Sequence, residues 1–164
     1  MRCVICAVFL VMACAIGAAA HSFDDEVSAV QRGNDMLTMR LLHPFAEKQD
    51  ARTQSHLGQL YYMGQGVPKN SQEAVRSWRL AAEEGDKEAP LNLGVMFDKG
   101  QGVPQDVIRA YMWYHLAAAA SSGADAMVAI KLRDRVASRM TAAQIGKSQE
   151  MARRCQDTKF KECG

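Results

Sequence analysis

The sequence has no Cys-x-x-Cys pair and no cluster of cysteines with histidines, so neither a redox dithiol nor a structural zinc site is predicted. It also lacks the Gly-x-Ser-x-Gly turn of serine hydrolases and the His-Glu-x-x-His of zinc peptidases. No block of lysine and arginine is interleaved with aromatic residues, which argues against nucleic-acid binding. No run alternates polar and apolar residues as a β-strand would. These absences favour an all-α protein with no catalytic residues, no metal site and no small-molecule cofactor.

The first twenty residues have the features of an export signal. Arg2 precedes an almost entirely apolar run that ends at Ala20. Ala18 and Ala20 fit the −3 and −1 positions of a cleavage signal, which predicts a periplasmic or secreted chain that begins at His21. Two alternatives stay open: the run is about long enough to remain as a membrane anchor, and Cys14 in "VMAC" could be lipidated. Membrane contact is expected only in those two cases.

Cleavage would leave two cysteines, Cys155 and Cys163, in an oxidising compartment. An even pair at this short spacing predicts a disulfide, and closing so small a loop should stabilise the fold by roughly 2–3 kcal/mol. Two free thiols, or pairing between chains, are the alternatives. Residues 125–164 carry 9 basic and 5 acidic side chains. Such a basic end could meet an acidic partner or anionic lipid, or could be a solvated helix face.

A long stretch of the chain recurs after 36 residues. "LGQLYYMGQGVPKN" at 57–70 aligns with "LGVMFDKGQGVPQD" at 93–106, and Leu80-Ala81-Ala82 aligns with Leu116-Ala117-Ala118. Matches at a single offset indicate an internal duplication. Each unit predicts two helices, the first from about Arg52 to Met63 and the second beginning near Ser71.

The ends of these helices are marked by suitable residues. Asn70 and Asp106 are predicted N-caps, and Glu73 would complete a capping box with Asn70. Gly85 and Gly123 are suited to the left-handed residue that closes a helix.

The flanks predict further helices. Residues 21–50 predict a pair joined at Gly33-Asn34, residues 126–140 predict an amphipathic helix, and Thr141 should cap a last helix. The predicted divisions are a signal peptide at 1–20, an N-terminal capping pair at 21–50, repeats at 51–86 and 87–124, and C-terminal capping helices with a disulfide-closed tail at 125–164.

The two units resemble Sel1-like repeats, which are relatives of the tetratricopeptide repeats. The family pattern is roughly A-x-x-x-L-G-x-x-Y-x-x-G-x-G-V-x-x-D-x-x-x-A-x-x-W-Y-x-x-A-A-x-x-G. The second unit follows it into "AYMWYHLAAA", whereas the first has Ser77 in the tryptophan slot and Trp78 in the tyrosine slot. The resemblance implies a right-handed superhelical solenoid of antiparallel helix hairpins. Its structural repeat positions would be Leu57, Gly58, Gly64, Gly66, Pro68, Trp78, Leu93, Gly94, Gly100, Gly102, Pro104, Trp113 and Tyr114.

The glycine-rich stretch "GQGVP" also raises the question of phosphate binding. A Walker loop needs different spacing and a preceding strand, and Pro68 and Pro104 remove an N–H that a phosphate cradle would use. The stretch is therefore predicted to be the corner between two helices. Gly58 lies mid-helix, where glycine costs about 1 kcal/mol against alanine. Its recurrence as Gly94 predicts that a second helix passes close by.

In tetratricopeptide-like arrays the first helix of each pair lines the concave face, and the resemblance implies the same here. The residues predicted to contact a partner are Ser55, Gln59, Tyr62, Leu91, Val95 and Asp98. Tyr62 beside Leu91 and Val95 would form a modest apolar patch for a peptide or helix. The alternative is that helix tilt buries Leu91 or Val95 against a neighbour.

The sequence thus predicts a non-catalytic protein-interaction scaffold whose partner is another protein or peptide segment. The resemblance implies an adaptor or regulator in envelope signalling, secretion or surface-polymer assembly. An envelope hydrolase acting on β-lactams or cell wall, and a structural envelope lipoprotein, are the alternatives.

Overall fold

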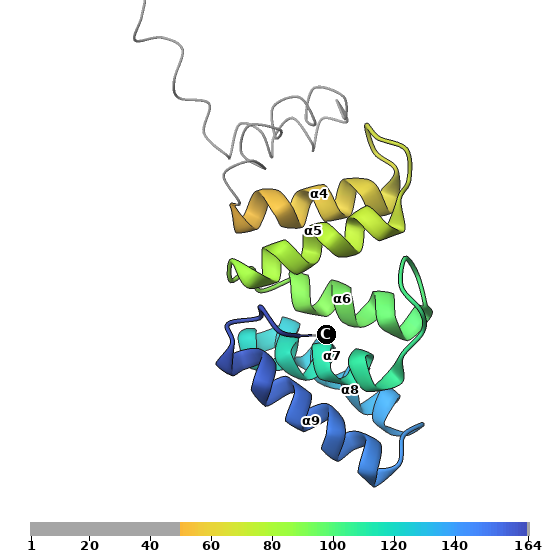
Figure 1. The fold of residues 1–164 in the computed structure, drawn as a ribbon, viewed down its shortest axis with the longest axis vertical. Coiled ribbons are helices and arrows are strands. Elements are labelled where there is room, and N and C mark those ends of the chain that lie inside the picture. The colour runs from red at the N-terminus through yellow and green to blue at the C-terminus, as the bar shows by residue number, and fades with distance from the viewer. Residues whose placement is uncertain (1–49, 164) are drawn as a thin grey trace, which may run out of the picture.

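A computed structural model describes residues 50–163, and this range contains six helices and no strand. They are α4 (Ala51–Met63), α5 (Ser71–Glu83), α6 (Ala89–Lys99), α7 (Val107–Ala120), α8 (Gly123–Ala137) and α9 (Ala142–Asp157). Figure 1 shows them stacked from α4 to α9 along the long axis of the molecule. The predicted all-α stack of helix pairs is confirmed. The predicted signal peptide and the predicted capping pair of residues 21–50, except its last residue, lie outside the described residues.

Side chains cap the second helices at the predicted residues. Asn70 Oδ1 accepts hydrogen bonds from two backbone N–H groups of α5 at 3.1 and 3.2 Å. Asp106 Oδ1 does the same for α7 at 2.9 and 3.0 Å. The reciprocal bond of a capping box forms at Thr141, whose N–H donates to Gln144 at 2.8 Å, and not at Glu73. These caps fix where three helices begin.

The two glycine-rich stretches are helix corners with matching geometry. Gly64 and Gly100 end α4 and α6 in the left-handed conformation, with φ of 75° and 67°. In the first corner the backbone N–H of Asn70 donates to the carbonyl of Tyr61 at 2.9 Å, and the equivalent bond in the second is 3.0 Å. The corner interpretation of "GQGVP" is therefore confirmed, because its turn geometry and backbone bonds connect two helices.

One predicted helix end is wrong. Gly85 follows α5 with φ of 88°, as predicted, but Gly123 does not close α7. α7 already ends at Ala120, because the next residue is extended, and Gly123 is the first residue of α8. The fifth described helix therefore spans 123–137 rather than 126–140.

α7 is the centre of the core. Its side chains are apolar on most sides, and Met112, Trp113, Tyr114 and Leu116 are each at most 2% exposed. The two repeats form tight hairpins, α4 on α5 and α6 on α7, whereas α8 and α9 both pack on α7. A helix that is apolar nearly all round is stable only when it is surrounded in this way. The third pair therefore opens around α7 instead of forming another regular hairpin.

Candidate protein-interaction site

Side-chain bonds connect the first helices of the three pairs, α4, α6 and α8. Tyr62 at the end of α4 donates its hydroxyl to Gln101 Oε1, just after α6, at 3.3 Å. Arg135 of α8 donates to Asp98 of α6 at 3.3 Å. These bonds bring the three first helices together along one side of the stack, and we call this side the first-helix face.

The six residues predicted to contact a partner differ widely in exposure. Ser55 and Asp98 are each only 9% exposed. Gln59 is exposed. Tyr62, Leu91 and Val95 are half-buried, and all three pack against the main core. The surface available to a partner is therefore narrower than predicted, and the partner-binding role of these residues stays a prediction.

Ser55 belongs to the joint between the two repeats. Its hydroxyl donates to Asp86 Oδ1 at 3.2 Å, and the same oxygen accepts the backbone N–H of Ala89 at 2.7 Å at the start of α6. Its backbone carbonyl accepts a hydrogen bond from Trp78 Nε1 at 3.2 Å. These contacts position α4 and α5 relative to α6, which is a structural role.

Tyr62 is held in place by its neighbours. Its ring lies against the indole of Trp78, with centroids 5.8 Å apart, and the ammonium of Lys69 lies 5.5 Å from the ring centre. Together with the hydroxyl bond to Gln101, these contacts fix an aromatic side chain that is still partly exposed. A rigid aromatic side chain can contact a partner with little loss of conformational entropy.

Asp98 is the charge that connects α6 to α8. Its two carboxylate oxygens pair with Arg135 and Arg139, whose side chains are 62% and 48% exposed. Tyr114 lies close by, and burial, followed by the negative charge of Asp98, raises the pKa of its hydroxyl to about 12. One buried carboxylate with two arginines leaves net positive charge on this part of the surface.

Sequence reasoning missed the contribution of α8 to this face. Val128 lies seven residues before Arg135 and hence on the same side of the helix. Val128 is 49% exposed, Met127 71% and Ile130 39%, an uncommon grouping of exposed apolar side chains on one helix. The amphipathic pattern of the sequence predicted a helix here, but it did not show that α8 packs on α7. In that packing Met127, Val128 and Ile130 stay exposed.

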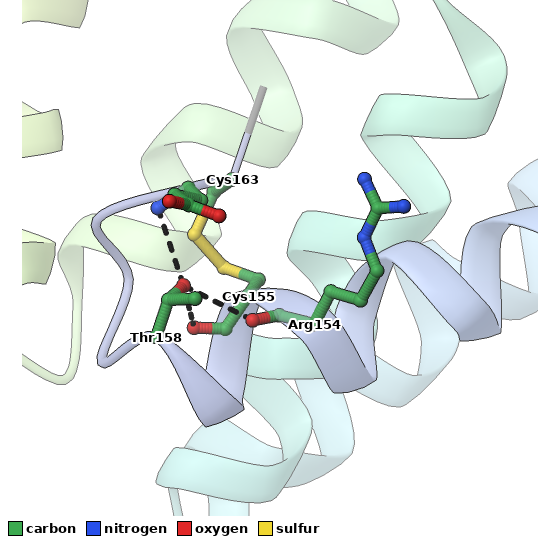
Figure 2. The surroundings of a disulfide bond; sticks show 5 residues. Arg154, Cys155, Thr158 and Cys163 are labelled. Atoms are coloured by element: carbon green, nitrogen blue, oxygen red, sulfur yellow. Dashed lines mark hydrogen bonds between the residues drawn. A yellow bond between two sulfur atoms is a disulfide. The ribbon is translucent and has the colours of Figure 1, made fainter.

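The predicted disulfide between Cys155 and Cys163 is present in the structure. Figure 2 shows it closing a short tail that folds back after α9. Thr158 organises the turn, because its hydroxyl donates to the carbonyls of Arg154 and Cys155 and accepts the N–H of Glu162. The tail is thereby fixed against the end of α9.

Within residues 50–163 no group of three or more His, Cys, Asp or Glu could hold a metal ion.

His115 is partly buried on α7, and burial, followed by the positive charge of Arg133, lowers the pKa of its imidazole. No described helix combines the length and the apolar character needed to cross a bilayer.

Comparison with known proteins agrees with this geometry. The family model for the Sel1 repeat matches residues 51–86 and 88–122. No curated protein matches the chain. Among solved structures, the chain is similar to c5321, a protective antigen of uropathogenic Escherichia coli strains that displays an SLR fold. The TM-score is 0.73 at 23% identity, over 84% of this chain and 30% of that one.

A second similar structure is a Sel1 repeat protein from Oxalobacter formigenes. It has a TM-score of 0.58 at 24% identity and covers 71% of this chain and 53% of that one. The present chain thus spans about a third to a half of the length of these two proteins, and at such identities the likeness shows the fold alone. The helical stack and these two likenesses show a helical solenoid fold, in which residues 51–86 and 88–122 match the Sel1 repeat.

Proposed function

We propose that this protein is a non-catalytic scaffold that binds a segment of a partner protein on the first-helix face. Sel1 repeats generally mediate protein–protein interaction, which supports the proposal. The observation that carries it is the connection of α4, α6 and α8 through Tyr62–Gln101 and Asp98–Arg135. A partner can therefore contact all three helices at once.

The chemistry of this face indicates the kind of segment that fits. Gln59, the partly exposed Tyr62 and Val128 offer polar, aromatic and apolar contacts. Lys131 is exposed on the same side of α8 as Arg135, so the α8 end of the face is basic. A segment with apolar anchors and acidic flanking residues matches this surface, since complementary charge steers association and fixes orientation.

The cellular location of the protein is part of the proposal. The leader pattern of residues 1–20 and the paired cysteines of the tail favour an exported protein in an oxidising compartment. There the scaffold would act as an adaptor or regulator in envelope signalling, secretion or surface-polymer assembly. Intact mass of the mature protein tests the export step: the expected N-terminus is His21, and lipid on Cys14 would contradict it.

Binding is tested with one charged substitution on each side of the molecule. Partners are captured from an envelope extract with the full mature chain and identified, and the purified partner is then titrated. Val128→Asp should weaken binding by about tenfold or more, because a buried apolar contact is lost and an acidic partner is repelled. Gln149→Asp, an exposed α9 position, should leave the affinity unchanged. Equal affinities of the two variants for the partner would refute the proposed face.

A further inference from the structure

A cleft of about 800 Å³ lies between the second helices α5, α7 and α9, and none of the first helices lines it. Trp113 and Met151 contribute apolar walls, while Arg79, Glu83 and Glu150 bring charges of both signs to it. The cleft exists because α9 packs on α7 and leaves a space next to α5. Its mixed lining suits a peptide better than a purely apolar ligand.

The C-terminal tail forms one wall of this cleft. Phe160 lines the large cleft and also a second cavity of about 490 Å³, and so does Glu83. The two cavities are therefore neighbours on either side of the tail. Phe160 is stacked nearly parallel on Trp113, with 6.3 Å between ring centroids and 20° between ring planes. An aromatic side chain of the tail thus forms part of the wall of both cavities.

The tail forms hydrogen bonds only within itself and with the end of α9. The hydrogen bonds that the structure gives to residues 158–162 all connect residues 154–162 with one another. Lys159 and Phe160 both have positive φ, 51° and 65°, which is unfavourable for residues with a Cβ. The disulfide and the ring contact with Trp113 therefore hold the tail in a conformation that the free chain would disfavour.

Trp113, which lines the cleft, carries an unused hydrogen-bond donor. Trp113 is 2% exposed, and its Nε1–H has no hydrogen-bond acceptor among the described residues. An unsatisfied buried donor is costly, and a peptide bound in the groove could supply a carbonyl oxygen to it. This is a second observation, independent of the cavity, that points to a peptide ligand.

We infer that the groove between α5, α7 and α9 is a second binding site, for a peptide segment with an aromatic side chain, and that the tail covers the Trp113 part of it as a plug. Reduction of Cys155–Cys163 releases the plug. A thiolate of a dithiol attacks Cys163 Sγ, and Cys155 leaves as a thiolate and takes up a proton. The second thiol of the reagent then displaces Cys163, so that the reagent ends as a disulfide and the protein carries two thiols. Cys163 lines the cleft whereas Cys155 is fully buried, which favours attack at Cys163.

Fluorescence of Trp113 tests whether the plug covers the groove. The chain has two tryptophans, so the substitution Trp78→Tyr leaves Trp113 as the only one. Tyrosine is chosen because the second repeat has Tyr114 at the equivalent position. Quenching by acrylamide should increase several-fold on reduction with dithiothreitol, and equally in Phe160→Ala with the disulfide intact. Far-ultraviolet circular dichroism confirms that the helices persist. Unchanged quenching in Phe160→Ala would overturn the plug.

Binding is tested with the tail sequence as probe. A labelled, end-blocked peptide of residues 158–162 should bind the reduced full-length chain and the Cys163→Ala variant, and bind the oxidised chain several-fold more weakly. The same peptide with alanine in place of its phenylalanine should not bind. Equal binding to oxidised and reduced protein, or no binding to either reduced form, would overturn the second site. The first-helix face is untouched by these changes, so failure here leaves the proposed scaffold function standing.

Discussion

Gly58 lies directly under the indole of Trp78: a Cβ placed on this glycine would be 2.6 Å from Trp78 Nε1. The second repeat has the same relationship, because a Cβ on Gly94 would be 2.5 Å from the ring of Tyr114. In each hairpin the two helices approach so closely that only glycine fits. This contact explains why the costly mid-helix glycine recurs after 36 residues.

Replacing Gly58 with alanine should therefore destabilise the protein by about 1–3 kcal/mol, since overpacking forces the indole or the helix to move. Gly146→Ala is the matched control, because Gly146 also lies within a helix but has nothing within 4 Å of a Cβ. The control should gain about 0.5–1 kcal/mol from helix propensity. Urea unfolding measures both, and a stabilised Gly58→Ala would contradict the close packing.

Gly102→Ala should destabilise the corner between α6 and α7 more than Gly85→Ala destabilises the end of α5. Both glycines have positive φ, which by itself costs alanine about 1–2 kcal/mol. A Cβ on Gly102 would in addition collide with the backbone of Ser71, whereas Gly85 has open space. Equal losses of stability for the two variants on thermal unfolding would contradict the packing of the second corner, between α6 and α7, on the start of α5.

Asp98→Asn should cost about 1–3 kcal/mol, because hydrogen bonds to a charged carboxylate from Arg135 and Arg139 are weakened. Arg135→Gln alone should cost less than about 1 kcal/mol, since that side chain is 62% exposed and Arg139 remains. The free energy of unfolding of both variants, measured at low and at high salt, tests whether these ion pairs stabilise the protein. An Asp98→Asn variant as stable as the parent would mean that α8 is held without this contact.

Stability should decrease as pH falls below about 6.5, the ordinary pKa of histidine. Burial and Arg133 lower the pKa of His115 in the folded chain, so the unfolded chain binds the proton more readily. The contribution is fully present above the unfolded pKa and is lost as pH falls through the folded one. In urea titrations at pH 7.5 and 5, His115→Gln should lose less stability than the parent between the two pH values. An equal loss would remove His115 as the cause.

Local features of this fold were predictable from the sequence. The repeat, the caps at Asn70 and Asp106, and the approach behind Gly58 follow from spacing and backbone preference, which act over a few residues. The roles of Ser55 and Asp98 did not follow. Asp98 pairs with arginines 37 and 41 residues away, in a segment outside the repeat, and no periodicity encodes such a contact.

The packing of α8 and α9 on α7, instead of on each other, likewise could not be predicted from the sequence. It arises because α7 is apolar on most sides and packs against both helices. This arrangement leaves apolar side chains of α8 exposed and leaves a cleft beside α9. The available signals were Phe160 inside the cysteine loop and the apolar composition of α7 on all sides.

The most direct test of the scaffold proposal is site-specific photocrosslinking in the intact cell. A photoreactive amino acid replaces Gln59 on α4, Val128 on α8 or, as control, Gln149 on α9, all of which are exposed. The account predicts that Gln59 and Val128 crosslink to the same partner protein and that Gln149 does not. Crosslinks from Gln149 alone, or different partners at Gln59 and Val128, would contradict a single binding surface across the first helices.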